Sequence, residues 1–382
     1  MYVYLNNAAT TRVDGRVLYR FSKFFRNLYE NPMTSVYSPG AKEVEAEMEK
    51  ARKEVSDLIN ASRKEIYFTS GGTESDNWAI KGIALNHWEE KGEIISTPIE
   101  HSAVLSSLKT VREWGFSVKF LHVDKFGMVD PDEVRKLITN KTILISVMHA
   151  NNEIGTIEPI KEIGEIAREK EIIFHTDAVQ TAAHIPIDVE EMNVDLLSMS
   201  AHKFYGPKGV GALYIREGVK ITPFMDGGHQ ERGFRAGTHN VPGIIGMGEA
   251  AKIGLSEMDK EMKEILELKN YILERFEKIE GIYVNGHPEK RLPGNINISI
   301  EGVKAETMLL YLGLNGIIVS AGSACSAKEK TPSHVLKAIE IPEDLYYNTI
   351  RISLGKFNTF EEIEYFLEVF ETGIKEYRRI KP

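Results

Sequence analysis

The order of short strand-like and helix-like segments is the feature that most restricts how this chain can fold. Over about the first two-thirds of its 382 residues, β-rich runs alternate with amphipathic stretches. Strands are expected at 65–69, 93–96, 117–122, 142–147, 172–174, 196–198 and 210–215, and helices at 74–90, 101–114 and 160–168. Such alternation is typical of a largely parallel sheet between layers of helices. We therefore predict an α/β fold whose active site lies at the carboxyl ends of the strands.

A second, smaller region is expected towards the C-terminus, because a chain of this length exceeds one simple core. A long charged helix is predicted over 251–280, bent or broken once. A loop rich in turn-forming residues follows at 285–293, and a strand at 295–300. We predict a large domain over 15–257 and a small α+β domain made of 1–14 and 258–382.

Composition excludes several classes of protein. The net charge of -9 gives no general attraction to nucleic acid or to an anionic membrane surface. Cys325 is the only cysteine, which rules out an internal disulfide and a multi-thiolate zinc site. The first residues lack the pattern of a secretory signal, and no apolar run is long enough to span a bilayer. We expect a soluble cytoplasmic protein with neither a nucleic-acid nor a membrane partner and without a resident metal.

Two residues that follow predicted strands indicate a cofactor. Lys203 comes directly after a short apolar strand and before a Gly-Pro turn, with no carboxylate among its sequence neighbours. A lysine in such a setting can act as the amine nucleophile of a Schiff base. Asp177 lies just past another strand, where a carboxylate can pair with a protonated pyridine nitrogen. Alone, each is more readily explained as a surface lysine or a capping aspartate; together they predict a pyridoxal phosphate (PLP) site.

A glycine-containing turn supplies the phosphate half of this predicted site. The segment Thr69-Ser-Gly-Gly-Thr-Glu-Ser75 joins a predicted strand to a predicted helix. Glycines let backbone amides approach an anion, and the N-terminus of the helix presents unpaired N–H groups and a favourable dipole. A Gly-Gly turn alone is weak evidence, but on the same sheet edge as Asp177 and Lys203 it completes a PLP site.

Cys325 lies in a small, polar, glycine-bearing run over residues 320–331. A structural cysteine is usually buried among large apolar side chains, which keep the thiol inert. An incidental surface thiol is one explanation of this setting. The predicted PLP site favours the other explanation, a reactive thiol that must move.

Eight segments of the chain, in order, resemble the cysteine desulfurases of the NifS/IscS type. These are fold-type I PLP enzymes of the class V aminotransferase family. The segments are 69–75, 99–103, 149–155, 175–180, 200–209, 235–238, 323–325 and 351–355. The resemblance covers essentially the whole chain. It implies a mainly parallel seven-stranded sheet between helices, PLP as the cofactor and L-cysteine as the substrate.

The resemblance also implies roles for individual residues. Lys203 would bind PLP covalently and move the substrate's α-proton, and Asp177 would pair with the pyridinium nitrogen. His101 would stack on the ring and assist proton transfer. Arg351 would clamp the substrate carboxylate, a task that suits a planar guanidinium. Further contacts to the phosphate, the ring or the substrate are expected from Gly72, Thr73, Asn152, Gln180, Ser200 and His202.

Two further residues imply partners. Thr238 resembles the residue that reaches the phosphate of the neighbouring subunit, which implies a homodimer with shared sites. Cys325 would attack the sulfur of the substrate, hold it as a persulfide and release alanine. The sulfur would then pass to an acceptor protein such as an iron–sulfur scaffold. Iron–sulfur cluster assembly is the expected use, and Cys325 could ligate a cluster transiently.

Three positions depart from the family's pattern. Asn6 stands where an Asp is common, Tyr37 where a His is usual, and His229 in place of a third glycine. These departures bear on substrate entry and on rate more than on the type of reaction.

Two alternatives stay open at this point. A selenocysteine lyase or another aminotransferase-like enzyme of class V could use the same cofactor site, and an aminotransferase would not need Cys325. A non-catalytic subunit of a sulfur-assembly complex is the second alternative. It predicts loss of Lys203 or Cys325, and both residues are present.

Overall fold

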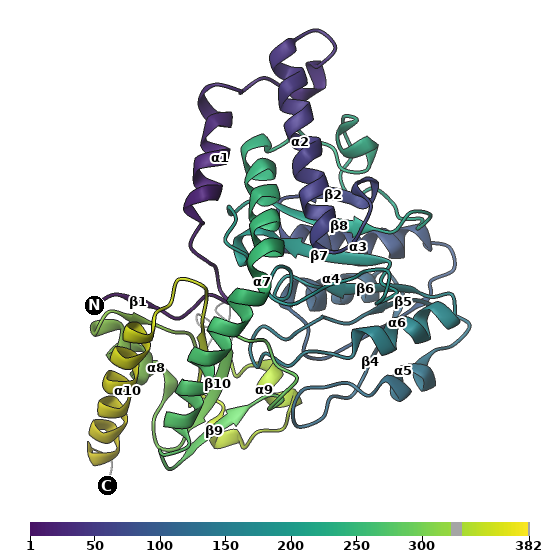
Figure 1. Ribbon diagram of the computed structural model, residues 1–382. Helices are drawn as coiled ribbons and strands as arrows, with labels where there is room; N and C mark the ends of the chain where they lie inside the picture. Colours follow the sequence, from purple (N-terminus) through teal and green to yellow (C-terminus); the bar gives the residue numbers. More distant parts are fainter. Residues whose placement is uncertain (322–330, 381–382) are drawn as a thin grey trace.

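A seven-stranded sheet forms the centre of the larger part of the molecule (Figure 1). The computed structural model describes residues 1–321 and 331–380, and Cys325 lies outside them. The strand order is β2-β8-β7-β6-β5-β3-β4. Only β8 runs antiparallel to its neighbours β2 and β7; the other pairs are parallel. The predicted mainly parallel seven-stranded sheet is therefore confirmed. The strands are β2 Ile66–Thr69, β3 Glu93–Ser96, β4 Ser117–Phe120, β5 Thr142–Ser146, β6 Ile173–Asp177, β7 Leu196–Ser200 and β8 Gly211–Ile215.

Helices cover both faces of this sheet because successive strand residues point to opposite sides. Leu196 packs in a cluster with residues of α3 and α4, whereas its neighbour Leu197 packs with residues of α1, α2, α6 and α7. The inner strands are accordingly apolar on both faces. The helices of this part are α1 Gly15–Arg26, α2 Pro39–Leu58, α3 Gly72–Asn86, α4 Ser102–Glu113, α5 Pro131–Leu137 and α6 Ile160–Glu169.

The long helix predicted over 251–280 is the main error in the elements expected from the sequence. It is the 36-residue helix α7, Val241–Phe276, and it begins earlier than predicted, with Asn240 as its N-cap. Gly243, Gly246 and Gly248 lower the helix propensity of its first turns. In the structure a Cβ on Gly248 would lie 2.5 Å from Cα of Ala51, so the glycine allows α7 to approach α2 closely. The helix was predicted to be bent or broken once; it has no break, and it ends at Phe276, before the predicted end.

The smaller part contains a three-stranded antiparallel sheet with β10 between β9 and β12. Its elements are β9 Ile282–Asn285, β10 Asn295–Ile300, α8 Ala305–Leu314, α9 His334–Ala338, β12 Thr349–Ser353 and α10 Phe360–Ile380. The N-terminal strand β1, Val3–Tyr4, returns to this part and pairs in parallel with β11, Ile317–Ile318. The chain thus begins and ends beside the smaller sheet (Figure 1).

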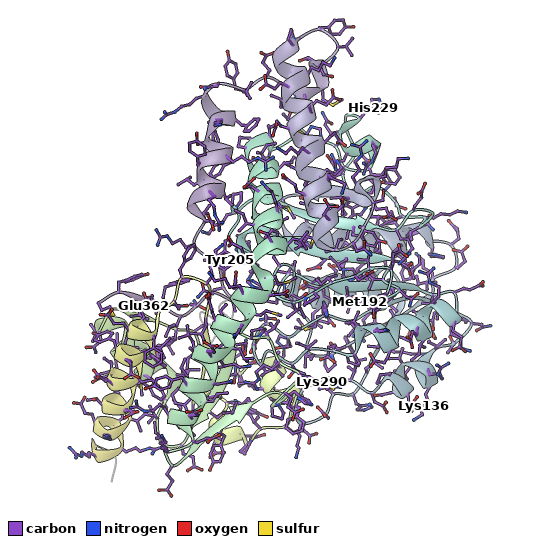
Figure 2. The ribbon with its side chains drawn as sticks, viewed as in Figure 1. Lys136, Met192, Tyr205, His229, Lys290 and Glu362 are labelled. Carbon is purple, nitrogen blue, oxygen red and sulfur yellow. The ribbon has the colours of Figure 1, made fainter. Side chains whose placement is uncertain are left out.

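Helix α7 joins the two parts, and its residues belong to two separate cores. Ile253 packs in the core of the large sheet, whereas Ile265 packs in the core of the smaller one. Tyr205 lies at the junction (Figure 2), where its hydroxyl donates to Oε1 of Glu261 on α7 at 2.6 Å. The division into 15–257 and 1–14 with 258–382 stays a prediction, which this change of core along α7 supports. Within the described residues, none of the helices has the length and apolar character needed to cross a membrane.

Candidate active site

Four predicted site elements lie at one edge of the large sheet. Asp177 is the last residue of β6, and Lys203 ends the short 3₁₀ helix Ala201–Lys203 that follows β7. His101 directly precedes α4 in the connection from β3, and the glycine turn follows β2. Since β2, β3, β6 and β7 run in the same direction, their carboxyl ends meet at this edge, where α/β proteins bind ligands. The sequence prediction that these residues converge is consistent with this geometry.

The amine of Lys203 is held beneath the N-terminal segment. Its Nζ donates to the carbonyl oxygens of Ala8 at 2.5 Å and of Ala9 at 3.1 Å. Nε2 of Gln180 donates to the same Ala8 oxygen at 3.1 Å. The side chains of Lys203 and Gln180 therefore meet at one point. This contact to the N-terminal segment was not predicted, because no local sequence signal connects residues 8 and 203.

Asp177 is a buried carboxyl, 5% exposed, whose Oδ1 accepts a hydrogen bond from the backbone N–H of Val179 at 2.9 Å. Burial raises the pKa of Asp177, and the positive charge of Lys203 and the imidazole of His101 limit the rise. A carboxylate in such surroundings is stabilised by a further cationic partner. A protonated pyridine nitrogen would be such a partner.

His101 caps helix α4 instead of lying inside it. Its Nδ1 accepts a hydrogen bond from the N–H of Ala103 at 3.2 Å, so the proton of the neutral ring resides on Nε2. Burial lowers the pKa of His101, and Lys203 lowers it further against the opposing effect of Asp177. A neutral imidazole can stack on an aromatic ring without the cost of burying a charge.

The glycine turn leaves the N-terminus of α3 open. Gly71 has φ 151°, an angle that L side chains rarely adopt, and no side chain caps the helix. A Cβ on Gly72 would lie 2.6 Å from Cγ2 of Val179, so only glycine fits there without a shift. The hydroxyl of Ser200 faces this turn, 3.6 Å from where a Cβ of Gly71 would stand. Thr73 is the second residue of the helix, and its N–H belongs to the same open end.

His202 precedes Lys203 in the 3₁₀ helix Ala201–Lys203 and is neutral near pH 7. Burial, Lys203 and Lys208 lower the pKa of His202 to about 4. Its Nδ1 makes a 3.1 Å hydrogen bond with the hydroxyl of Thr10.

The site as a whole fits PLP, which carries a phosphate, an aldehyde and a basic ring nitrogen. The open helix end and the Ser200 hydroxyl suit the phosphate, the Lys203 amine suits the aldehyde, and the buried Asp177 carboxyl suits the ring nitrogen.

Arg351 on β12 is buried, at 2% exposure, in the smaller part of the molecule. Its Nη1 donates to the carbonyl oxygen of Asn152 at 2.8 Å, and its Nη2 donates to Oδ1 of Asn6 at 3.0 Å. Asn152 therefore contacts Arg351 through its backbone, while the role predicted for its side chain stays a prediction. The contact of Asn6, one of the three departures from the family's pattern, was missed.

Thr238 is exposed, in a segment that is fixed to the glycine turn of its own chain. Nε and Nη2 of Arg235 donate to the carboxylate of Glu74 in the first turn of α3, at 2.7 and 3.1 Å. Glu231, a buried residue that precedes Arg235 in the chain, accepts hydrogen bonds from the guanidinium of Arg52 on α2 and so fixes the start of this segment. Thr238 is thus presented outward from the vicinity of the turn. Its predicted contact with a neighbouring subunit stays a prediction.

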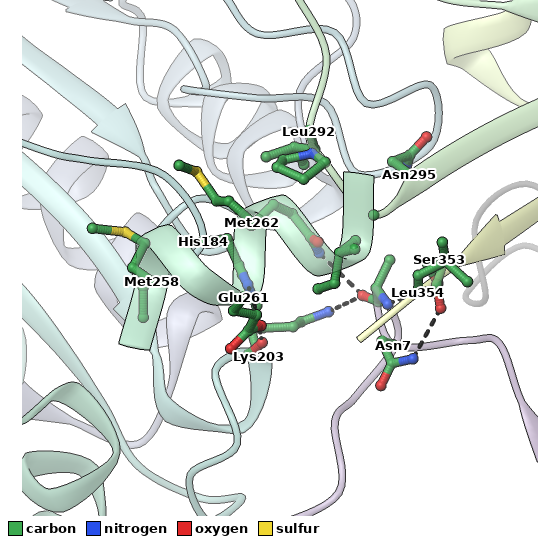
Figure 3. Close-up of a pocket in the computed structure, with 16 residues that line it drawn as sticks. Asn7, His184, Lys203, Met258, Glu261, Met262, Leu292, Asn295, Ser353 and Leu354 are labelled. Carbon is green, nitrogen blue, oxygen red and sulfur yellow. Dashed lines mark hydrogen bonds and ion pairs between the residues drawn. The ribbon is translucent and has the colours of Figure 1, made fainter. Parts of the chain in front are cut away.

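A pocket that is partly open to solvent adjoins the side chain of Lys203 (Figure 3). Nε2 of His184 donates to the carbonyl oxygen of Lys203 at 2.8 Å, and Met258, Glu261 and Met262 of α7 also line the pocket. Asn7 and Ser353 close the end of the pocket towards the smaller part. The candidate site therefore lies between the two parts of the molecule.

The described flanks of residues 322–330 both contact this site. Ser320 pairs with Arg351 through backbone hydrogen bonds of 3.1 and 2.6 Å. On the other flank, the hydroxyl of Ser333 donates to Oε2 of Glu153 at 2.6 Å, and Nε2 of His334 donates to the carbonyl oxygen of Glu100 at 2.9 Å. Sequence analysis missed Ser333, His334 and Glu153. The segment Thr331-Pro-Ser-His334 is a helix-start signal that could have placed Ser333 and His334 at an ordered turn.

The other two departures lie away from these contacts. Tyr37 is 91% exposed in the turn before α2. His229 is also exposed, and Figure 2 shows it at the outer edge of the larger part. No described contact connects either residue with Lys203, Asp177 or His101.

Comparisons with known proteins agree over almost the whole chain. Residues 3–366 match the family model described as aminotransferase class-V. The chain is 48% identical over 380 residues to a cysteine desulfurase IscS of Methanosarcina thermophila, covering all of this chain and 94% of that protein. A solved NifS-like protein superposes with a TM-score of 0.92 at 41% identity, covering 97% of this chain and 99% of the other. A structure described as SspA in complex with cysteine gives a TM-score of 0.82 at 35% identity, covering 94% and 100%.

Proposed function

Because the chain belongs to the class V aminotransferase family, we propose that it is a PLP-dependent cysteine desulfurase. It has the architecture of the fold-type I PLP enzymes. Its substrate would be L-cysteine, as in the cysteine complex of the SspA structure, and its products L-alanine and a persulfide on Cys325. The observation that carries the proposal is the placement of Lys203, Asp177 and His101 at one sheet edge beside an open, glycine-lined helix end.

The residues would hold PLP at its three polar groups. The N–H groups of Gly72 and Thr73 with Ser200 and His202 would hold the phosphate, Asp177 the ring nitrogen and Lys203 the aldehyde carbon. His101 would cover one face of the ring, and Gln180 would contact a ring substituent. When bound, PLP supplies an electron sink that acidifies the substrate's α-hydrogen and makes its sulfur electrophilic.

The protein's own groups orient the substrate and move its protons. The guanidinium of Arg351 would bind the substrate carboxylate in a planar, bidentate manner. Nζ of Lys203 would take the α-proton and return it to the carbon chain. The neutral His101 has a proton on Nε2 and can donate it to the carbon from which the sulfur leaves.

Cys325 would accept the sulfur atom. Its thiolate would attack the substrate sulfur, which breaks the carbon–sulfur bond and forms a sulfur–sulfur bond. The electron pair of the broken bond stays with the carbon, which takes up a proton. One L-cysteine and one thiol thus give one L-alanine and one Cys325 persulfide, and no external oxidant is needed. The attacking group must be the thiolate, since the thiol is a poor nucleophile.

The proposed partners follow from the same chemistry. A persulfide has to be transferred, so a sulfur-acceptor protein such as an iron–sulfur scaffold is expected, and iron–sulfur cluster assembly is the proposed use. A homodimer would let Thr238 reach the neighbouring phosphate site, and the fixed, outward Arg235–Thr238 segment supports this. A cytoplasmic location is proposed with these roles.

The test of the function is direct. The purified protein is incubated with L-cysteine and PLP, and alanine and sulfide are measured with and without a thiol reductant. Alanine should form in amounts that match the sulfide released. A rate of alanine formation no higher than that of the Lys203→Ala variant would refute the proposal.

The Arg351→Gln variant tests how the substrate is held. We expect kcat/KM for L-cysteine to fall by about 100-fold or more, mainly through KM, because a buried charged contact to the carboxylate is worth about 2–5 kcal/mol. The PLP absorption band should persist. Cysteamine, which lacks the carboxylate, should react equally with both proteins. An equal loss with cysteamine would contradict the assigned role and indicate a general structural defect.

A further inference from the structure

A chain of buried polar groups lies behind Asp177, between the sheet and α3. Oγ of Ser146 on β5 lies 2.9 Å from Nδ1 of His175 on β6, and Nε2 of His175 lies 3.0 Å from Oγ of Ser198 on β7. Asp76 of α3 follows, with its Oδ1 3.8 Å from the same Nε2. His175 and Asp177 are two residues apart on one strand and so point to the same face. Asp76 and Asp177 therefore share one buried region.

In the part of the chain that the structure describes, one oxygen of the Asp76 carboxyl lacks the hydrogen-bond partner that a buried carboxylate needs. Asp76 is 1% exposed, and its Oδ1 has no hydrogen-bond partner among residues 1–321 and 331–380. The titratable groups that act on it are the carboxyls of Asp177 on β6 and Glu100 before α4, with the imidazole of His175 next to it. Both nitrogens of His175 are occupied by serine hydroxyls, and burial keeps that ring neutral by lowering its pKa to about 3.

The charge on Asp76 and on Asp177 depends on which of the two carboxyls is protonated. Burial raises the pKa of Asp76 well above its ordinary value, and the nearby Asp177 raises it further, with Ser198 opposing. Two carboxylates in one desolvated region cannot both ionise readily. Asp177 faces Lys203 and His101, whereas Asp76 faces neutral hydroxyls and other acids. The cationic side of the region is the side of Asp177.

We propose that Asp76 is a positioning residue that carries the single proton of a buried carboxyl pair, so that Asp177 is the ionised member that faces the ring nitrogen of the cofactor. The part that names the ring nitrogen rests on the proposed function. A protonated Asp76 can donate to Ser198, whose hydroxyl then donates to Nε2 of His175, and Nδ1–H of His175 donates to Ser146. The proton would thus orient every hydrogen bond in the chain behind Asp177.

The Asp76→Asn variant tests this proton without cofactor. A carboxyl whose native pKa lies above its unfolded value destabilises the fold progressively as the pH rises between the two values. As the pH rises above the unfolded value of about 4, wild-type apoprotein should therefore lose stability through Asp76, whereas the neutral amide should not. The melting temperature of the variant minus that of the wild type should increase between pH 5.5 and 8 by about 2–4 °C. Glu100 and His175 are the same in both proteins.

A second readout uses the bound cofactor. Asparagine replaces a neutral acid by a neutral amide of the same shape, so the pH midpoint of the PLP absorption band should shift by less than about 0.3 units. Removal of a nearby charge shifts such a midpoint by about one unit or more. Asp177→Asn is the matched control that removes the charged member, and it should shift the midpoint and weaken PLP binding.

Three results would overturn the proposal. They are a midpoint shift of about one unit in Asp76→Asn, a shift equal to that of Asp177→Asn, or a melting-temperature difference that does not grow with pH. If Asp76→Asn does not fold, Asp76→Thr offers a second neutral side chain for the same comparison. Wild-type protein that binds no PLP would refute the proposed function alone, because the apoprotein melting curves still test the carboxyl pair.

Discussion

The Cys325→Ser variant is expected to form alanine from L-cysteine at least about a thousandfold more slowly than the wild type. A serine hydroxyl is neither ionised near neutral pH nor able to hold sulfur as a persulfide, so the carbon–sulfur bond has no acceptor. The substitution changes one atom of a side chain that no predicted cofactor contact uses. The PLP absorption band and the melting temperature should therefore stay close to wild type.

This experiment distinguishes a cysteine desulfurase, which needs the thiol of Cys325, from an aminotransferase-like enzyme, which does not. Alanine and sulfide are measured together, and trapped persulfide is detected by mass spectrometry of the alkylated protein. Ser326→Ala is the matched control, since it changes the next residue of the same segment. Alanine formation that survives in Cys325→Ser would mean that the thiol is dispensable, as the aminotransferase alternative predicts.

Lys203→Ala is the second variant with a large expected effect, again a loss of at least about a thousandfold in turnover. It removes the amine that would bind PLP covalently and move the α-proton. Borohydride treatment should fix PLP to the wild-type protein but not to the variant, and peptide mapping should locate the label on Lys203. The measurement is independent of turnover, so it distinguishes a lost covalent bond from a slow reaction.

Lys208→Ala is the control for this variant. Lys208 is five positions along the chain in the Gly-Pro-Lys-Gly turn and is exposed. It should retain borohydride labelling and most of the activity. Labelling of Lys203→Ala at the wild-type level would mean that another lysine holds the cofactor, and the assignment of Lys203 would be wrong.

The sequence predicted the large sheet better than the helix that leaves it. Strands buried on both faces are short apolar runs bounded by polar residues, and this pattern depends only on local order. The start of α7 could not be found in this way, because Gly243, Gly246 and Gly248 are unfavourable in an isolated helix. Their use becomes clear only when α2 is packed against them, with Ala51 in contact with Gly248.

The candidate site also has a part that the sequence predicts and a part that it does not. The sequence by itself determined that Asp177, Lys203 and the Gly71–Gly72 turn follow strands, and parallel strands bring such residues to one edge whatever the details of packing. Only the tertiary structure decided that Ala8 lies over Lys203, that Asn6 and Asn152 hold Arg351, and that Asp76 shares a buried region with Asp177. The physical reason is that these contacts join segments far apart in the chain. Hydrogen-bond partners, burial and the charge of a buried carboxyl depend on which side chains meet there, and strand order does not specify this.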